Sequence, residues 1–119
     1  MVIDAGHGEF TRVVYAPGTA EEAFRLTMRA FDIAERFQIP AILLSDQYLA
    51  DSQKDVASDI FSVQFNQRHV LSREDSKQVT AYDRYSLSQS RTGVSPRAIP
   101  SWIDGVIYVD SDEHTEKVI

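Results

Sequence analysis

Three aspartates that end or follow apolar runs are of a type and spacing that could do chemistry in this sequence. Asp46 closes one short, mainly apolar run, Asp110 closes another, and Asp112 follows two residues later. If both runs are parallel strands, the carboxylates collect beyond the carboxyl ends of the strands, where open α/β sheets bind ligands. Carboxylate oxygens suit Mg²⁺, so these residues could hold a magnesium ion, with His114 as a further ligand. The alternative is that they are solvated residues at points where the chain re-enters water.

A histidine between two glycines is the second feature with chemical potential. Gly6, His7, Gly8 and Glu9 are typical of a loop, because glycine allows positive φ and close approach of the backbone to another group. A histidine there leaves room for a ligand and changes its charge near neutral pH. Glu9 is close enough in sequence to orient it. The alternative is a turn histidine that hydrogen-bonds locally.

A strand-helix-strand unit between residues 12 and 46 is expected to position these groups. An apolar run at 12–16 is halted by Pro17-Gly18, a helix-length segment covers 19–37, and a second apolar run covers 41–46. Two short strands joined by a helix form a right-handed crossover with parallel strands. The apolar residues of the second run are consecutive, so we expect both faces of that strand to be covered.

The central helix has clear start, stop and face signals. Thr19 can cap its first turn, and Glu22 can reach back to complete a capping box. Ile39-Pro40 is expected to end it, because the residue before proline is pushed out of the helical region. Apolar residues recur at three- and four-residue steps, which predicts one buried face. This face comprises Ala23, Leu26, Thr27, Ala30, Ile33, Ala34 and Phe37.

The remaining chain gives weaker patterns. We expect a short helical turn at Gln47–Ala50, an exposed loop at Ser72–Gln78 and an extended edge segment at Val79–Leu87. Two prolines exclude a helix from Val94–Pro100. Gly105–Asp110 is β-branched and aromatic at its centre and is predicted to be a third strand. The predicted fold class is therefore α/β, a parallel sheet with flanking helices.

Length and composition narrow the functional class. The 119 residues suit a single domain, and with no cysteine the chain has neither disulfides nor cysteine-held metal centres of its own. A formal net charge of −6 argues against nucleic acid or a membrane surface as the main partner. Arg68, His69 and Arg73 form a local basic cluster, for which the alternative is a solvated loop. No run approaches the roughly 18 apolar residues of a membrane span and no leader opens the chain, so we expect a cytoplasmic protein.

Short blocks, in order along the chain, carry a family resemblance. They are His7–Phe10, Arg12–Thr19, Glu21–Phe24, Ala30-Phe31, Ala34-Glu35, Leu43–Asp51, Arg84-Tyr85, Gly93–Pro100 and Asp110–His114. Together they resemble the α subunit of 2-oxoacid:ferredoxin oxidoreductases. The resemblance runs nearly end to end and is weakest from Gln53 to Val79.

The resemblance implies a role in a multi-subunit enzyme. Such enzymes oxidatively decarboxylate a 2-oxoacid with thiamine diphosphate and magnesium, pass electrons through iron–sulfur clusters on other subunits to ferredoxin, and form an acyl-coenzyme A. The chain resembles only the later part of the thiamine-diphosphate-fold domain that packs on the cofactor's aminopyrimidine. The implied partners are the thiamine-binding β subunit and the remainder of the α subunit.

Two departures from the family pattern limit what this chain is expected to do. The upstream half of the domain, with the glutamate that activates the aminopyrimidine, has no counterpart, so the chain alone is not expected to bind or activate the cofactor. Many relatives have an arginine where this chain has Gly6, and Arg84 or Arg97 could replace it at the substrate carboxylate. Strands that normally pair with the missing half would leave open apolar edges, so we expect an oligomer or a bound partner.

The leading interpretation is part of the α subunit of such an oxidoreductase, either truncated or from a split reading frame. It would shape the substrate side of the thiamine pocket and the subunit interface, with the Gly6–Glu9 loop nearest the chemistry. One alternative is a non-catalytic interaction domain that keeps the fold. The other is an independent magnesium-dependent enzyme that uses the strand-end aspartates.

Overall fold

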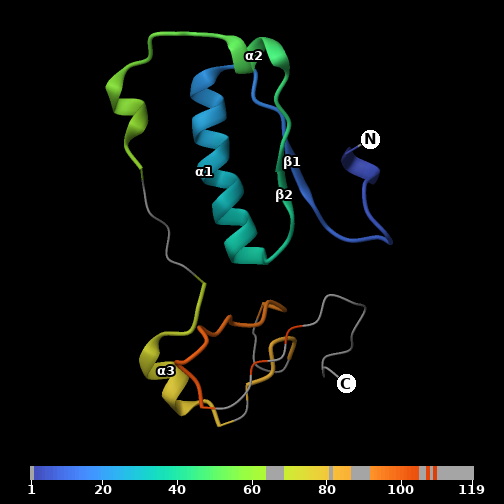
Figure 1. The fold of residues 1–119 in the computed structure, drawn as a ribbon, viewed down its shortest axis with the longest axis vertical. Coiled ribbons are helices and arrows are strands. Elements are labelled where there is room, and N and C mark those ends of the chain that lie inside the picture. The colour runs from blue at the N-terminus through green and yellow to red at the C-terminus, as the bar shows by residue number, and fades with distance from the viewer. Residues whose placement is uncertain are drawn as a thin grey trace. The chain divides into compact units, whose positions relative to one another are not determined.

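The computed structural model describes residues 2–63, 69–80, 82–86, 92–104, 107 and 109. It divides into two compact units, Met1–Gln67 and Arg68–Ile119. The first unit contains the strands β1 and β2 and the helices α1 and α2, and the second contains the helix α3 (Figure 1). No helix in the described part of the chain is long and apolar enough to cross a membrane.

The first unit is built around a parallel strand pair covered by one long helix. β1 (Val13–Tyr15) is followed by α1 (Ala20–Phe37), which leads into β2 (Ala41–Leu43), and α1 packs along both strands. The strands are parallel, as predicted. Backbone bonds extend the ladder at both ends, from the Val13 N–H to the Pro40 carbonyl at 3.0 Å and from the Leu44 N–H to the Tyr15 carbonyl at 2.8 Å. The α/β class and the strand-helix-strand unit are therefore confirmed.

The start of α1 combines two side-chain caps. Thr19 has an extended backbone, and its Oγ1 accepts a hydrogen bond from the Glu22 N–H at 3.2 Å. The Glu22 carboxylate in turn accepts from the Gly18 N–H at 2.8 Å, one residue before the position that a standard capping box would use. The cap therefore joins the helix to the Pro17-Gly18 turn, and Pro17 is buried there.

α1 ends shortly before Pro40, as the proline predicts. The helix stops at Phe37, and Gln38 takes a left-handed conformation with φ of 55° while its N–H donates to the Ala34 carbonyl at 3.0 Å. Pro40 then leads directly into β2. Ala30, 6% exposed, is the buried residue of the helix.

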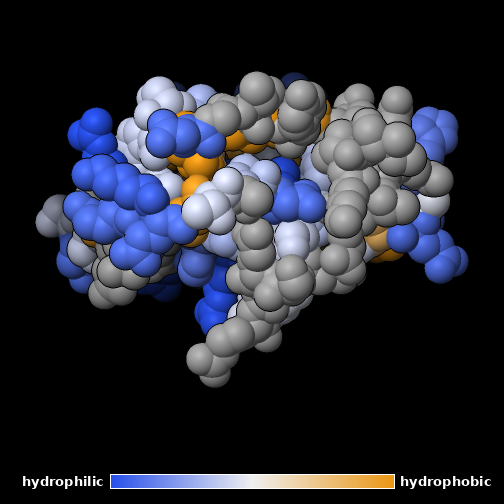
Figure 2. All heavy atoms as spheres, turned by 90° about the horizontal axis from the view of Figure 1, so that it is seen from below, coloured by the Kyte–Doolittle hydropathy of each residue, from blue (hydrophilic) through white to orange (hydrophobic). Residues whose placement is uncertain are grey.

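The expectation that both faces of the second strand are covered is wrong for this chain. All residues of β1 and β2 are half-buried, and Leu44 just after β2 is 38% exposed. The physical reason is that the sheet has two strands in the described residues, with α1 packed against it. Apolar side chains elsewhere in the described residues also reach the surface, and Figure 2 shows orange areas among hydrophilic ones on one face.

Two predictions about short helices had opposite outcomes. The predicted turn at 47–50 is present as α2 (Gln47–Asp51). The predicted loop at 72–78 is instead the helix α3 (Arg73–Gln78). Ser72 caps it, because its Oγ accepts from the Asp75 N–H at 3.0 Å and donates to the Asp75 carboxylate at 2.7 Å. This local Ser-x-x-Asp cap supplies the helix signal that apolar periodicity does not.

The extended segment predicted at Val79–Leu87 is also corrected in its described part. Residues 82–86 contain a turn at Arg84 and Tyr85, and no strand occurs in 79–80 or 82–86. The Tyr82 hydroxyl donates to the Pro96 carbonyl at 2.9 Å and accepts from the Ala98 N–H at 3.1 Å. Bonds between a side chain and the backbone therefore hold this segment in place of a strand ladder.

The later part of the second unit is irregular, as its prolines require. Residues 94–100 contain no helix, and Arg97 forms an isolated parallel bridge with Val70. Of the predicted strand Gly105–Asp110, Ile107 and Val109 are described and neither lies in a strand, while its other residues lie outside the described part.

Candidate functional site

The glycine-bracketed loop lies between a short 3₁₀ turn at Val2–Asp4 and β1. Gly6 and Gly8 both have positive φ, 129° and 79°, which explains why glycine occupies each position. His7 and Glu9 are exposed, and neither forms a hydrogen bond or ion pair with another described residue. The expected pairing of Glu9 with His7 is therefore not formed.

The base of this loop is a stack of three groups. The Phe10 ring lies against Gly6, where an added Cβ would be 2.7 Å from ring atom Cε1 and 2.8 Å from Cζ. The Arg12 guanidinium lies over the ring, 4.1 Å from its centroid. Arg12 also places Nη1 3.5 Å from the Val2 carbonyl oxygen. The loop therefore has a closed base and an open tip.

A shallow depression of about 650 Å³ opens beside the loop. It is lined by Ile3, Asp4, Gly8, Glu9, Phe10, Thr11 and Arg12. The lining holds two carboxylates, Asp4 and Glu9, and one guanidinium, Arg12, so it repels a diphosphate group more than it attracts one. No group of three metal-ligating side chains occurs in the described residues. The depression does not fit thiamine diphosphate by itself, and any complete cofactor site needs groups beyond it.

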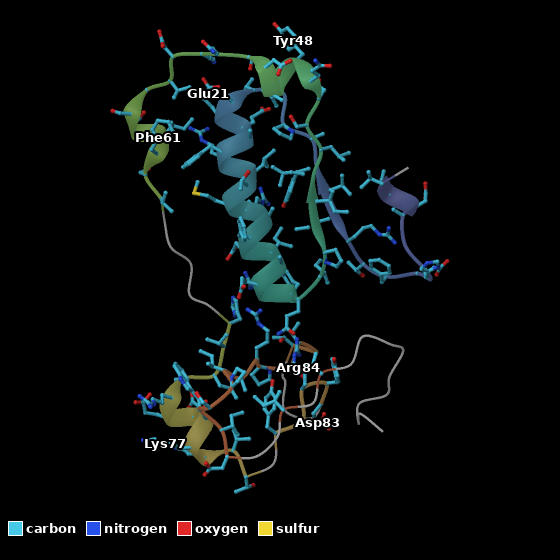
Figure 3. The ribbon with its side chains drawn as sticks, viewed as in Figure 1. Glu21, Tyr48, Phe61, Lys77, Asp83 and Arg84 are labelled. Carbon is cyan, nitrogen blue, oxygen red and sulfur yellow. The ribbon has the colours of Figure 1, made fainter. Side chains whose placement is uncertain are left out.

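The other predicted carboxylate-binding residues belong to the second unit. Arg84 lies in a turn with Tyr85, next to Asp83 (Figure 3), and its guanidinium lies 5.5 Å from the centroid of the Tyr85 ring. Arg97 is half-buried within the bridge to Val70, and its carbonyl accepts from the Leu71 N–H at 2.7 Å. Both residues are thus engaged locally, whereas the Gly6–Glu9 loop belongs to the first unit.

Asp46, one of the predicted metal ligands, caps a helix. Its Oδ1 accepts from the Leu49 N–H at 2.7 Å, which begins α2. Asp110, Asp112 and His114 lie outside the described residues. The strand-end magnesium site therefore stays a prediction, and the described member has a structural role.

The predicted basic cluster is described only in part. Arg68 lies outside the described residues, and His69 is exposed. Arg73 stands at the start of α3 with its guanidinium 6.0 Å from the centroid of the Trp102 ring.

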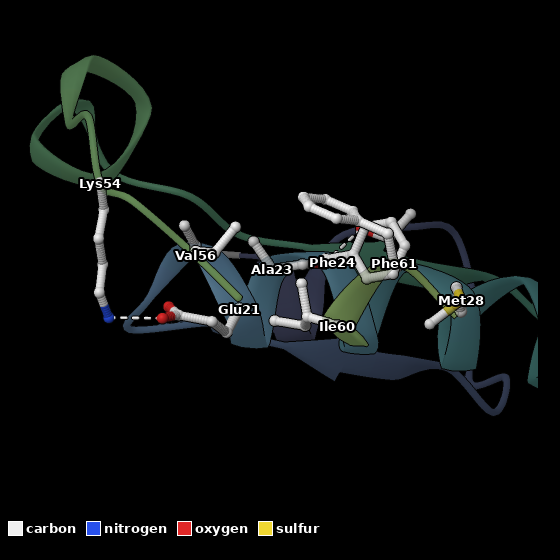
Figure 4. A pocket seen from close by; sticks show the side chains of 10 residues that line it. Glu21, Ala23, Phe24, Met28, Lys54, Val56, Ile60 and Phe61 are labelled. Carbon is white, nitrogen blue, oxygen red and sulfur yellow. Dashed lines mark hydrogen bonds and ion pairs between the residues drawn. The ribbon is translucent and has the colours of Figure 1, made fainter. Parts of the chain in front are cut away.

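Sequence reasoning missed an apolar groove on α1. Its volume is about 440 Å³, and Figure 4 shows how Phe24 and Phe61 form one wall, with ring centroids 5.3 Å apart and ring planes at 80°. At its rim Lys54 pairs with Glu21 at 2.5 Å. The lining residues are Ala20, Glu21, Ala23, Phe24, Thr27, Met28, Lys54, Val56, Ile60 and Phe61. A second apolar stripe on the helix, at Ala20, Phe24, Thr27 and Met28, was the available signal.

The parallel strand-helix-strand unit and the loop that leads into it define an α/β domain with a partial site. Residues 2–119 match the family described as "Pyruvate flavodoxin/ferredoxin oxidoreductase, thiamine diP-bdg". The chain belongs to this family, which confirms the resemblance seen in its sequence blocks.

Several curated relatives carry related names. The chain is 33% identical over 119 residues to "2-oxoacid:ferredoxin oxidoreductase 1, subunit alpha" of Sulfurisphaera tokodaii, which covers 97% of this chain and 18% of the relative. It is 28% identical over 94 residues to "Ketoisovalerate oxidoreductase subunit VorB" of Methanothermobacter marburgensis, covering 79% of this chain and 25% of the relative. A "2-oxoglutarate synthase subunit KorA" of Archaeoglobus fulgidus is 41% identical over 51 residues, which cover 43% of this chain and 15% of the relative. The relatives are therefore much longer oxidoreductase subunits. No solved structure matches the chain.

Proposed function

We propose that this chain is part of the α subunit of a 2-oxoacid:ferredoxin oxidoreductase. The assembled enzyme would oxidatively decarboxylate a 2-oxoacid to an acyl-coenzyme A and deliver the electrons to ferredoxin. The observation that carries the proposal is the family match over residues 2–119, supported by a relative named as such a subunit over 97% of the chain.

Within that enzyme, the chain would form one wall of the thiamine diphosphate pocket and part of the subunit interface. The Gly6–Glu9 loop supports this role, because His7 and Glu9 are exposed with no partner among the described residues. Thiamine diphosphate and Mg²⁺ would bind only in the assembled enzyme, and iron–sulfur clusters would reside on other subunits. The chain contributes a surface, and the β subunit and the rest of the α subunit complete the site.

Arg84 and Arg97 are the proposed residues for binding the carboxylate of the substrate. Arg84 and Arg97 carry the planar guanidinium that binds carboxylates through two parallel hydrogen bonds. Each would have to exchange a local contact for the substrate, since Arg84 lies against Tyr85 and Arg97 belongs to the bridge with Val70.

Exposed apolar surface favours a chain that functions in a complex. Leu44, Phe31 and Tyr48 are 38%, 68% and 86% exposed, and the two-stranded sheet leaves strand edges without a neighbour in the described residues. Unpaired strand edges are sites where further strands add. The same observation also favours the second candidate function, a non-catalytic interaction domain.

Thermal denaturation with three additions separates the candidate functions. The chain is measured alone, with Mg²⁺, and with the companion subunits of a relative. We expect companion subunits to raise the melting temperature by mass action, and Mg²⁺ alone to leave it unchanged. Stabilisation by Mg²⁺ alone, abolished in the Asp110→Asn variant, would instead indicate the magnesium-dependent enzyme. No shift with either addition would contradict the proposal and leave the interaction domain.

A further inference from the structure

Gly6, Phe10 and Arg12 lie in close contact at the base of the loop. The Phe10 ring fills the place of a side chain on residue 6, because a Cβ there would lie 2.7 Å from the ring. The Arg12 guanidinium lies over the ring, 4.1 Å from its centroid, and its Nη2 would lie 3.5 Å from the same Cβ. Planar guanidinium groups attract aromatic rings in this arrangement. The ring and the cation therefore both border the space that a side chain on residue 6 would need.

Glycine is favoured at positions 6 and 8 of the loop for reasons that differ in part. Both have positive φ, which disfavours any side chain. At Gly8, however, an added Cβ would meet nothing within 4 Å, whereas at Gly6 it would strike the Phe10 ring. Only Gly6 is therefore required by a close approach. Gly8→Ala therefore serves as a control for a side chain at positive φ that meets no close neighbour.

The stack is joined to the rigid part of the first unit. Arg12 immediately precedes β1, and the adjacent Val13 N–H donates to the Pro40 carbonyl at 3.0 Å. On its other side, Arg12 Nη1 lies 3.5 Å from the Val2 carbonyl oxygen, at the start of the chain segment that enters the loop. The contacts therefore connect the entry of the loop, its exit and the sheet.

We propose that Phe10 and Arg12, with the space left by Gly6, are positioning residues that lock the loop and present His7 and Glu9 to the pocket of the assembled enzyme. The inference rests on the proposed function, because the pocket belongs to the assembled enzyme. The lock itself is a property of this chain. Neither Phe10 nor Arg12 needs to touch the substrate in this role, since they act through the conformation of residues 6–9.

The lock is tested by nuclear magnetic resonance on the 119-residue chain. In the unmodified chain we expect contacts between the Phe10 ring and both the Gly6 Hα and the Arg12 side chain. The backbone order parameters of residues 6–9 should be about 0.85. In Gly6→Ala these order parameters fall below about 0.6, and in Gly8→Ala they fall less, because only the backbone strain of a positive φ is added there. The further loss caused by Gly6→Ala is smaller in the Phe10→Ala background than in the unmodified chain, because the ring that the Cβ strikes is gone.

A fold control accompanies these variants. The amide resonances of α1 report whether the first unit remains folded, and Phe10→Leu provides a milder change that keeps apolar bulk and removes the ring. Equal behaviour of Gly6→Ala and Gly8→Ala, or absent contacts between Phe10 and Arg12 in the unmodified chain, would overturn the lock.

The positioning role is tested by kinetics of the assembled enzyme that carries this chain. Phe10→Leu and Gly6→Ala should each lower kcat/KM for the 2-oxoacid by about tenfold or more, because misplaced groups at a reacting centre are costly. Arg12→Lys keeps the charge and loses the planar contact, so this variant should also lower kcat/KM. Gly18→Ala, where a Cβ would make only an ordinary 3.6 Å contact with Glu22, is the matched control.

The two arms separate the possible failures. Unchanged kcat/KM in variants whose loop has lost order would overturn the positioning role and leave the proposed function standing. An inactive assembled enzyme with unmodified chain would contradict the proposed function, and the positioning role with it, while the resonance measurements still decide whether the lock exists.

Discussion

Several charged side chains whose types suggest chemistry instead cap a helix or lie on an aromatic ring. Asp46 begins α2 through the Leu49 N–H, and Glu22 closes the Gly18 turn ahead of α1. Arg12 lies on the Phe10 ring. A carboxylate or guanidinium in a sequence therefore signals a local bond as readily as a ligand, and a cap can be recognised only from the residues around it.

The Thr19 cap gives the first prediction. Thr19→Ala removes the oxygen that accepts from the Glu22 N–H, so the free energy of unfolding should fall by about 1 kcal/mol. Urea denaturation followed by far-ultraviolet circular dichroism measures this. Thr27→Ala is the control in the same helix, because Thr27 Oγ1 only donates to the Ala23 carbonyl, and no comparable loss is expected. Equal losses in both variants would contradict the cap.

The Glu21–Lys54 pair gives a prediction about pH. The hydrogen bond from Lys54 lowers the pKa of the Glu21 carboxyl below its ordinary 4.5, and the backbone bond at Glu21 acts in the same direction. Because the folded pKa is lowered, the pair stabilises the chain above pH 4.5 and loses that contribution as the pH falls through the lowered value. Lys54→Met should therefore lower the melting temperature near pH 7 and make progressively less difference as the pH falls below 4.5. A melting-temperature difference that persists at the lower pH would contradict this assignment.

At the scale of elements, α1 organises the first unit through two apolar stripes. One stripe packs on β1 and β2, with Ala30 buried. The other receives the chain that follows α2, through Phe24 and Phe61. A helix with two such stripes links its own strands to a later segment.

The Phe24–Phe61 contact gives the third prediction. Phe61→Ala should release the 3₁₀ turn at Ser58–Phe61 from α1 and cost about 1–2 kcal/mol of unfolding free energy, less than a core phenylalanine because Phe61 is 54% exposed. Limited proteolysis should cut faster near this turn. Phe31→Ala on the same helix, 68% exposed and without a ring partner among the described residues, should change neither quantity. Equal proteolysis of both variants would show that the ring pair does not hold the segment.

The sequence predicts helices and strands well where the apolar periodicity agrees with capping, proline and glycine residues at the ends of each run. β1, α1 and β2 were predicted because Thr19, Pro17-Gly18 and Pro40 mark the ends of strongly patterned runs. α3 was missed because it is polar and depends on the Ser72 cap. The stack at Gly6, Phe10 and Arg12 was missed because it depends on a φ value and on contacts that only coordinates give.

At the scale of the whole molecule, the chain spans a small part of its relatives' length and has a sheet with little cover. It covers 18% of the Sulfurisphaera tokodaii relative, and its small sheet leaves β1 and β2 half-buried. In the proposed assembly, other chains or further parts of the α subunit would supply the burial that completes such a sheet.

This incompleteness predicts association in solution. Multi-angle light scattering over a range of concentrations should show a dimer or a larger species, because exposed strand edges and residues such as Leu44 associate. Companion subunits should replace this self-association by a mixed complex. A monodisperse monomer at all concentrations would contradict the prediction.

Turnover of a 2-oxoacid in isolated and assembled form tests the central claim most directly. The chain alone, supplied with thiamine diphosphate, Mg²⁺ and coenzyme A, should decarboxylate no 2-oxoacid. The Sulfurisphaera tokodaii α subunit, with its matching segment exchanged for this chain and its companion subunits present, should reduce ferredoxin in a 2-oxoacid-dependent reaction. Decarboxylation by the isolated chain, or a correctly assembled exchange subunit without activity, would contradict the account.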